Sequence, residues 1–328
     1  MDRDRGRKLI KAFLGNGSSG FMGEKTAMDQ PAVPVRVLPL YPMMEHLLTL
    51  EEEVWFDYAW SREPLEGKFS REQKMAYAKR AAECGRSEAE ALLGRVRAGG
   101  ADAGAGSDGM KAGASAPGAG PDGTKTGASA PGASPGGTKT GASVPGAGPG
   151  GTKTGASAPD DGLSGTRLWD LAGAMGLKIS TPRIPNGGGH VIFAQYQEPD
   201  AITIFMDSAD KARALIEEES LSLLLGDRAA EDVLLAHELF HVVEYRKRDS
   251  IYTQTEKVEL WRKPFSNRSR LICLGEIAGM EFARRLTGLS YTPYVLDVLM
   301  MYGYDKGAAT ALYEEIAAFA GDGGGKEQ

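Results

Sequence analysis

The feature that most restricts the fold is a long stretch in the middle of the chain that offers almost nothing to bury. Residues 108 to 161 repeat with a period of fourteen, as in "DGTKTGASAPGASP" and "GGTKTGASVPGAGP". Glycine, alanine, serine and proline supply little apolar surface, and one lysine in each unit favours hydration, so ordering the segment would cost more entropy than burial could offset. A solenoid would need a periodic apolar face. We therefore expect residues 98–165 to form a disordered, low-complexity linker, and any core must come from the sequence on either side.

Charge and cysteine content exclude several classes of protein. The 328 residues carry a formal charge of -6, so there is no overall basic field and we do not expect a nucleic-acid partner. The apolar runs are too short for a membrane span or for the core of a signal peptide. Cys84 and Cys273 lie far apart and in no Cys-x-x-Cys arrangement, which argues against a disulfide framework. These observations favour a cytoplasmic protein with no membrane partner, and they leave the oligomeric state open.

The sequence ahead of the linker divides into two parts. Residues 1–68 mix apolar and charged residues without sustained periodicity, and we treat them as an N-terminal extension of unclear structure. Residues 69–97 predict a helical pair broken at Gly85, with Ser87 as the cap of the second helix and Glu90 completing a capping box. The pair superficially looks like a helix-turn-helix, but few arginines and no groove-reading helix favour simple packing over DNA binding.

Beyond the linker the pattern predicts a compact α+β domain over residues 166–318, followed by a flexible tail at 319–328. A helix ending at Gly176 precedes three short runs rich in β-branched and aromatic residues, "LKIS", "HVIFAQY" and "AITIFMD". From Asp207 the apolar period becomes helical, and Asp227 is a candidate cap for the helix that follows. The expected architecture is a small sheet packed on helices.

The stretch "LLAHELFHVVEY", residues 234 to 245, carries the chemistry. Positions i and i+4 share one helix face, so His237 and His241 can each offer a ring nitrogen to one metal ion. Glu238 is rotated off that pair but stays close to it. This is the His-Glu-x-x-His arrangement, in which a zinc ion activates a water molecule and the glutamate accepts its proton.

The alternative is that these three residues merely decorate an amphipathic helix. The neighbouring residues argue against it, because they predict a helix that is buried nearly all round, and a glutamate is rarely buried there without a partner. The apolar neighbours are Val233, Leu234, Leu235, Ala236, Leu239, Phe240, Val242 and Val243. The pattern therefore favours a metal site.

A zinc site of this type needs a third protein ligand. No third histidine follows at the expected spacing, so the ligand should be a carboxylate. Glu276 in "CLGEIAGMEFA" has apolar helical neighbours and should face inward, which makes it the preferred ligand. Glu244, one turn beyond His241, is the rival, although a straight helix places it farther from His237. Glu281 shares its surface with arginines and is assigned to a solvated face or to an outer contact of the site.

The motif and the later helix "GEIAGMEFARRLTGL" together resemble the ImmA/IrrE type of zinc metallopeptidase domain, over about residues 166–287. Glu276 followed by Phe282 and Ala283 matches the family's second element, although "GME" stands where the family usually has Glu-Ala-Asn. The resemblance implies a zincin-like, gluzincin-type fold, a Zn²⁺ cofactor and His237, His241 and Glu276 as its ligands. It also implies kinship with bacterial and phage-associated proteases that cut or antagonise transcriptional regulators.

Several other features stay open. His190 follows three glycines and suits a turn better than a catalytic role, and His46 has no motif around it. Stabilising an oxyanion needs a donor such as a tyrosine hydroxyl, and four tyrosines lie downstream without one being preferred. They are Tyr291, Tyr294, Tyr302 and Tyr304. One of the last two strands could present an edge to an extended peptide, and residues 244 to 270 are either a flap or an insertion.

Three hypotheses follow from the sequence. The first is a cytoplasmic zinc-dependent endopeptidase with Glu238 as general base, acting on a protein substrate such as a transcriptional regulator. The alternative is a non-catalytic, metal-containing binding or regulatory module that acts by protein contact. The third is a closed structural site in which an extra side chain, such as Glu244, joins Glu276 on the ion. Spacing alone does not distinguish zinc from manganese or iron.

Overall fold

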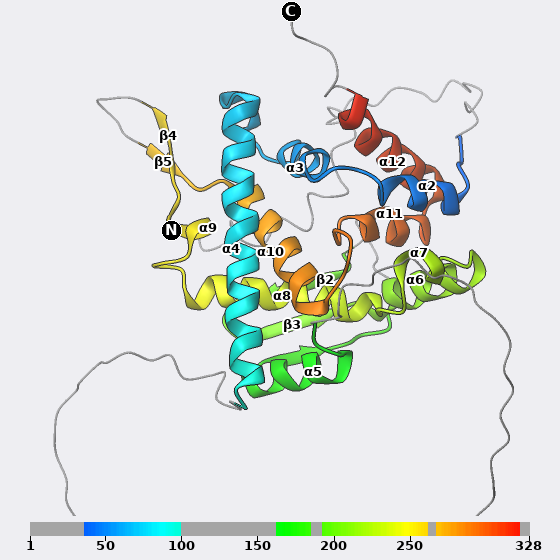
Figure 1. The fold of residues 1–328 in the computed structure, drawn as a ribbon, viewed down its shortest axis with the longest axis horizontal. Coiled ribbons are helices and arrows are strands. Elements are labelled where there is room, and N and C mark those ends of the chain that lie inside the picture. Colours follow the sequence, from blue (N-terminus) through cyan, green and yellow to red (C-terminus); the bar gives the residue numbers. More distant parts are fainter. Residues whose placement is uncertain (1–35, 100–161, 185–191, 262–266, 322–328) are drawn as a thin grey trace, which may run out of the picture. The chain divides into compact units, whose positions relative to one another are not determined.

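The computed structural model describes residues 36–99, 162–184, 192–261 and 267–321 (Figure 1). Within them, segments from both sides of the repeat share one hydrophobic core. Residues 100–161 of the predicted linker 98–165, the glycine-rich turn with His190, and the chain end from residue 322 lie outside the described residues. The predicted end of the linker at residue 165 is wrong, because Leu163 is buried and a helix starts at Gly165.

The segment before the repeat contributes three α-helices and one 3-10 turn. They are α2 (Leu40–Leu47), α3 (Glu52–Trp60), η2 (Glu66–Lys68) and α4 (Arg71–Arg97). α2 packs against the later helix α11 (Val295–Tyr302), and α3 packs against α12 (Lys306–Gly321). Residues 36–68 of the predicted extension and the predicted helical pair therefore belong to the same core as residues 166–318, while residues 1–35 lie outside the described residues.

The predicted break at Gly85 is wrong, because α4 is one continuous helix. A capping box formed by Ser70 and Gln73 starts it, whereas the Ser87 hydroxyl bonds to Glu83 and caps nothing. A Cβ at Gly85 would lie 2.0 Å from the carbonyl oxygen of Ala278 on α10 (Ile272–Thr287). The glycine thus permits a close helix crossing and does not end a helix.

After the repeat, α5 (Gly165–Ala174) leads into a three-stranded sheet of β1 (Lys178–Ser180), β2 (Ala194–Gln197) and β3 (Ala201–Ile204). The strand order is β1-β3-β2, with β1 parallel and β2 antiparallel to β3. β3 is therefore internal and β2 is an edge strand. The three strands appear where the sequence predicts them, and the fold is mostly helical with a small sheet.

The remaining elements are helical except for one hairpin. They are α6 (Met206–Glu218), α7 (Ser222–Leu225), α8 (Ala230–Arg246), α9 (Tyr252–Thr255), the hairpin β4 (Val258–Trp261) and β5 (Asn267–Ser269), and then α10, α11 and α12. α8 has Ala229 at its N-cap and no side-chain cap, so the prediction of Asp227 as its cap is wrong. α12 continues to Gly321, so the predicted tail begins too early.

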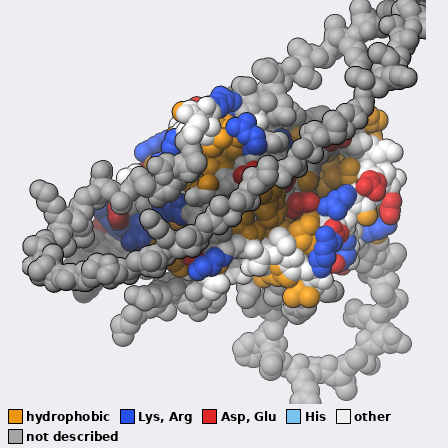
Figure 2. All heavy atoms as spheres, turned by 90° about the horizontal axis from the view of Figure 1, so that it is seen from below, with side chains coloured by type: hydrophobic (Ala, Val, Ile, Leu, Met, Phe, Trp, Pro, Cys, Tyr) orange, Lys and Arg blue, Asp and Glu red, His pale blue; other side chains and the backbone are white. Residues whose placement is uncertain are grey.

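The surface carries both signs of charge. On the face shown in Figure 2, lysine and arginine side chains lie among acidic and apolar ones. None of the described helices combines the length and the apolar composition that a bilayer crossing requires.

α10 is the central helix of this core, because it packs against both α4 and α8 (Figure 1). Its start is held by Glu63, whose Oε2 accepts the backbone N–H groups of Ile272 at 2.7 Å and Cys273 at 3.1 Å. The cap comes from the loop after α3, so the segment before the repeat anchors the helix that carries Glu276.

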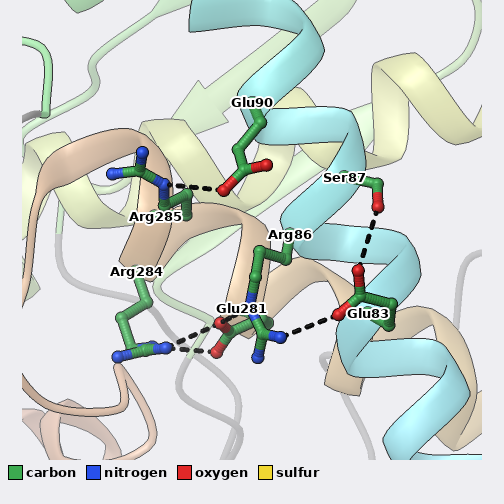
Figure 3. A network of polar contacts seen from close by, with 7 residues as sticks. All are labelled: Glu83, Arg86, Ser87, Glu90, Glu281, Arg284 and Arg285. Atoms are coloured by element: carbon green, nitrogen blue, oxygen red, sulfur yellow. Dashed lines mark hydrogen bonds and ion pairs between the residues drawn. The ribbon is translucent and has the colours of Figure 1, made fainter.

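An ion-pair network joins α10 to α4 (Figure 3). Arg86 donates to Glu281 at 3.1 Å and to Glu83 at 2.7 Å, and Arg284 donates to Glu281 at 2.7 Å. Arg285 reaches Glu90 at 3.3 Å. The assignment of Glu281 to a solvated face needs correction, because its side chain is buried and two arginines pair with it.

Candidate metal centre

α8 and α10 bring His237, His241 and Glu276 together at one point. The Nε2 atoms of the two histidines lie 3.1 Å apart. Glu276 Oε2 lies 3.4 Å from His237 Nε2, and its Oε1 lies 3.8 Å from His241 Nε2. Ligand atoms at about 2.1 Å from a tetrahedral ion are about 3.4 Å from one another. These buried donor atoms could therefore hold a single metal ion.

Glu244 orients His241 and is not part of that donor group. Its Oε2 lies 3.3 Å from His241 Nδ1, and its Oε1 accepts a hydrogen bond from the Thr253 hydroxyl. An Nδ1–H bond to Glu244 leaves the lone pair of Nε2 free for an ion. The arrangement therefore differs from Glu244 as the rival third ligand and from a structural site closed by Glu244, because each of these needs the Glu244 carboxylate on the ion.

Two glycines on α10 allow α8 to approach this closely. A Cβ at Gly279 would lie 2.9 Å from Cε1 and 3.0 Å from Nδ1 of His237, and a Cβ at Gly275 would lie 3.2 Å from Glu244 Oε1. This role of Gly275 and Gly279 was not expected from the sequence. Two glycines four apart inside a helix lower its intrinsic stability, and their position on either side of Glu276 was the available signal.

The donor groups perturb one another's protonation. Burial alone would lower the pKa of His241, but the hydrogen bond with Glu244 and the charges of Glu276, Glu244 and Glu238 raise it to about 10. Burial opposes ionisation of Glu276, yet the hydrogen bond from His237 and the charges of both histidines leave the pKa of Glu276 below its usual value. The carboxylates thus hold a proton on His241 that an ion bound to Nε2 would replace.

Glu238 lies beside the donors with one oxygen available. The backbone N–H of Tyr196 on β2 donates to its carboxylate, and burial raises the pKa of Glu238. Glu238 Oε2 is buried and has no hydrogen-bond partner among the described residues. β2 therefore meets the glutamate directly, whereas β3 is internal and cannot present an edge to a peptide.

A cavity of about 60 Å³ lies against the centre. Most of its wall is apolar, and its ionisable residues are His237, Glu238, Glu276 and Asp297. The apolar lining is Phe193, Ala194, Val233, Leu234, Met280, Pro293, Leu296, Met300 and Leu312. Asp297 was not expected from the sequence, although a single acidic residue within the apolar run "VLDVLMMY" indicates a buried carboxylate.

Asp297 is tied to the segment before the repeat. Its Oδ2 accepts a hydrogen bond from the hydroxyl of Tyr58 on α3 at 3.2 Å. Burial raises the pKa of Asp297 to about 7, against the effect of the Tyr58 hydrogen bond. The cavity beside the donors thus contains one acidic group, Asp297, that is not part of the His-Glu-x-x-His motif or its third ligand.

None of the other described residues considered from the sequence is among the donors, although burial and then the charge of Glu276 raise the pKa of Tyr294. The hydroxyl groups of Tyr291, Tyr302 and Tyr304 donate to Leu225, Leu38 and Asp207. Tyr294 is buried and stacks on Trp55 with ring centroids 6.0 Å apart. His46 Nδ1 lies 2.9 Å from the Tyr313 hydroxyl, which joins α2 to α12. None of these side chains lines the described cavity.

Comparisons with protein-family models, with curated proteins and with solved structures gave no match to this chain. The resemblance to the ImmA/IrrE type therefore stays a prediction that depends on the motif residues. The structure itself adds the buried His-His-Glu cluster and its cavity.

Proposed function

We propose that the protein is a zinc-dependent endopeptidase of zincin-like architecture, with His237, His241 and Glu276 as ligands and Glu238 as general base. The observation that carries the proposal is the buried Oε2 of Glu238, which has no partner in the described part of the chain and lies beside three donors. A structural zinc site is closed by four protein ligands, whereas three donors leave one coordination position open. A buried acid next to an open position suits catalysis.

Two histidines and one carboxylate form a donor set that suits zinc. When bound, zinc supplies Lewis-acid activation of a water molecule and of the carbonyl that it attacks. Glu238 accepts the proton of that water and returns it to the leaving amine. Burial favours the first transfer, because it raises the pKa of Glu238 and so makes the carboxylate a stronger base.

A peptide substrate fits the edge of the sheet better than a small molecule does. β2 is an edge strand, and the backbone of Tyr196 contacts Glu238. An extended peptide that pairs beside such an edge gains main-chain hydrogen bonds and comes to lie next to the glutamate. The substrate we propose is therefore a protein segment in extended conformation, and the resemblance suggests a cytoplasmic transcriptional regulator.

The test starts with metal content, measured on protein purified without a metal-affinity column. We expect about one zinc per chain in the wild type and in Glu238→Gln, and a loss of zinc in His237→Ala and Glu276→Ala. Cleavage of a denatured protein mixture, followed by mass spectrometry of new chain ends, should occur only in the wild type. A wild type without bound metal, or a Glu238→Gln variant that still cleaves, would refute the proposal.

The non-catalytic alternative gives a different result in the same experiment. A metal-containing binding module would hold zinc in both the wild type and Glu238→Gln, yet produce no new chain ends with either. Its biological activity would survive the Glu238→Gln substitution.

A further inference from the structure

The cavity beside the candidate centre has one polar position that the proposed chemistry does not use. Asp297 on α11 is only 8% exposed and lies between the apolar side chains of Leu296 and Val298 in sequence. Asp297 lines the cavity together with His237 and Glu276, and its carboxylate accepts a hydrogen bond from the Tyr58 hydroxyl.

Two other buried carboxylates in the described part of the chain have several partners each, and Asp297 differs from these two. Glu281 pairs with two arginines, and Glu63 accepts two N–H groups at a helix start. For Asp297, no described lysine, arginine or histidine forms an ion pair. Arg62 pairs with Glu315 at 2.8 Å and hydrogen-bonds Tyr58, so its guanidinium reaches Asp297 only through the tyrosine. Because Asp297 lines the cavity, a cation from outside can reach its carboxylate, and a charge pair there would offset the cost of burying it.

The size and the walls of the cavity indicate which cation. A volume of about 60 Å³ accommodates roughly four to six water-sized groups. This matches a lysine side chain, whose apolar stem packs well against apolar walls while its ammonium group forms charge-assisted hydrogen bonds. An acidic side chain would meet Asp297 and Glu276, and an apolar one would leave the Asp297 carboxylate without a cation.

We propose that Asp297 is a specificity-determining residue, which binds the ammonium group of a substrate lysine next to the bond that is cut. The inference rests on the proposed endopeptidase function. Tyr58 then acts as a positioning residue, because its hydroxyl fixes the orientation of the carboxylate.

The test uses full-length, zinc-loaded protein and amino-acid hydroxamates, which chelate the ion and direct one side chain into the cavity. Isothermal titration compares lysine hydroxamate with norleucine hydroxamate, which has the same stem length and no charge. The wild type should prefer lysine hydroxamate by about tenfold or more, as expected for a buried charge pair. Asp297→Asn should abolish that preference.

The matched control is Asp207→Asn. Asp207 also accepts a tyrosine hydroxyl, from Tyr304 at 2.7 Å, but it does not line the cavity, so this variant should keep the preference. A second variant, Asp297→Glu, lengthens the carboxylate by one methylene and should shift the preference to the shorter ornithine hydroxamate. It keeps the test decisive if Asp297→Asn does not fold.

The outcomes separate this inference from the proposed function. Equal affinities in the wild type, or a lysine preference that survives Asp297→Asn, overturn the role of Asp297 and leave the metal centre standing. Failure of every hydroxamate to bind overturns it as well. A lysine preference in a protein that cleaves nothing supports the binding role of Asp297 while refuting the endopeptidase.

Discussion

Both faces of α10 pack closely against another helix, but their polar side chains differ. Toward α4, the helices approach closely at Gly85, and the charges above that crossing pair off as Arg86 with Glu281. Toward α8, they approach closely at Gly279, but there the histidines and carboxylates gather without any lysine or arginine among the donors. On the α4 face the described charges pair with one another, whereas the α8 face gathers donor atoms that could hold a metal ion. The glycines set how closely α10 packs on each neighbouring helix. The charges on each face decide whether its polar groups pair with one another or leave a cluster of donor atoms.

The strongest way to break the comparison is to separate α10 from α4. Gly85→Ala puts a Cβ 2.0 Å from the Ala278 carbonyl oxygen, and backbone cannot move aside cheaply. We expect a loss of about 3 kcal/mol in the free energy of unfolding, measured by denaturant titration. Gly94→Ala is the control on the same helix, because no atom lies within 4 Å of its added Cβ. That variant should gain about 0.5 to 1 kcal/mol, and equal stability of the two variants would contradict the crossing.

The next substitution disturbs the α8 face. Gly279→Ala brings a Cβ to 2.9 Å from the His237 ring, which must then turn away from the shared point. We expect zinc affinity to fall by about ten- to a hundredfold, as when a metal ligand loses its orientation. Competition with a chromophoric chelator measures this. Gly173→Ala on α5 is the control, because its Cβ meets nothing within 4 Å, and unchanged affinity in Gly279→Ala would contradict the assigned role.

The N-terminal cap of α10 should stabilise the whole helix, and therefore both of its packed faces. Glu63→Gln replaces a charged acceptor of the Ile272 and Cys273 N–H groups by a neutral one at a helix N-terminus. We expect a loss of about 1 to 2 kcal/mol in the free energy of unfolding at neutral pH. Glu66→Gln, which removes the exposed half of an ion pair with Lys74, should change it by less than about 0.5 kcal/mol. Equal effects of the two substitutions would show that Glu63 is no special cap.

The difference between the two faces also explains what the sequence could predict. The His237–His241 pair is local, since helix periodicity alone places both rings on one side, and the apolar neighbours of Glu276 indicate an inward carboxylate. The role of Gly85 is not local. The same glycine suits a helix break or a helix crossing, and only the distant Ala278 backbone decides between them. Asp297 and Glu63 escaped prediction for the same reason, because their partners come from the other side of the repeat.

The smallest expected effect sharpens the comparison within the α4 face. Arg285 and Glu90 lie 3.3 Å apart near the surface, whereas Arg86 reaches the buried Glu281. A double-mutant cycle with alanine at Arg285 and Glu90 should give a coupling below about 0.5 kcal/mol, because solvent screens the pair. The cycle at Arg86 and Glu281 should give the larger coupling, since the Glu281 carboxylate has lost its water. If both cycles gave the same small value, burial would not distinguish the two ion pairs. The packing of α10 on α4 would then depend on the crossing at Gly85 alone.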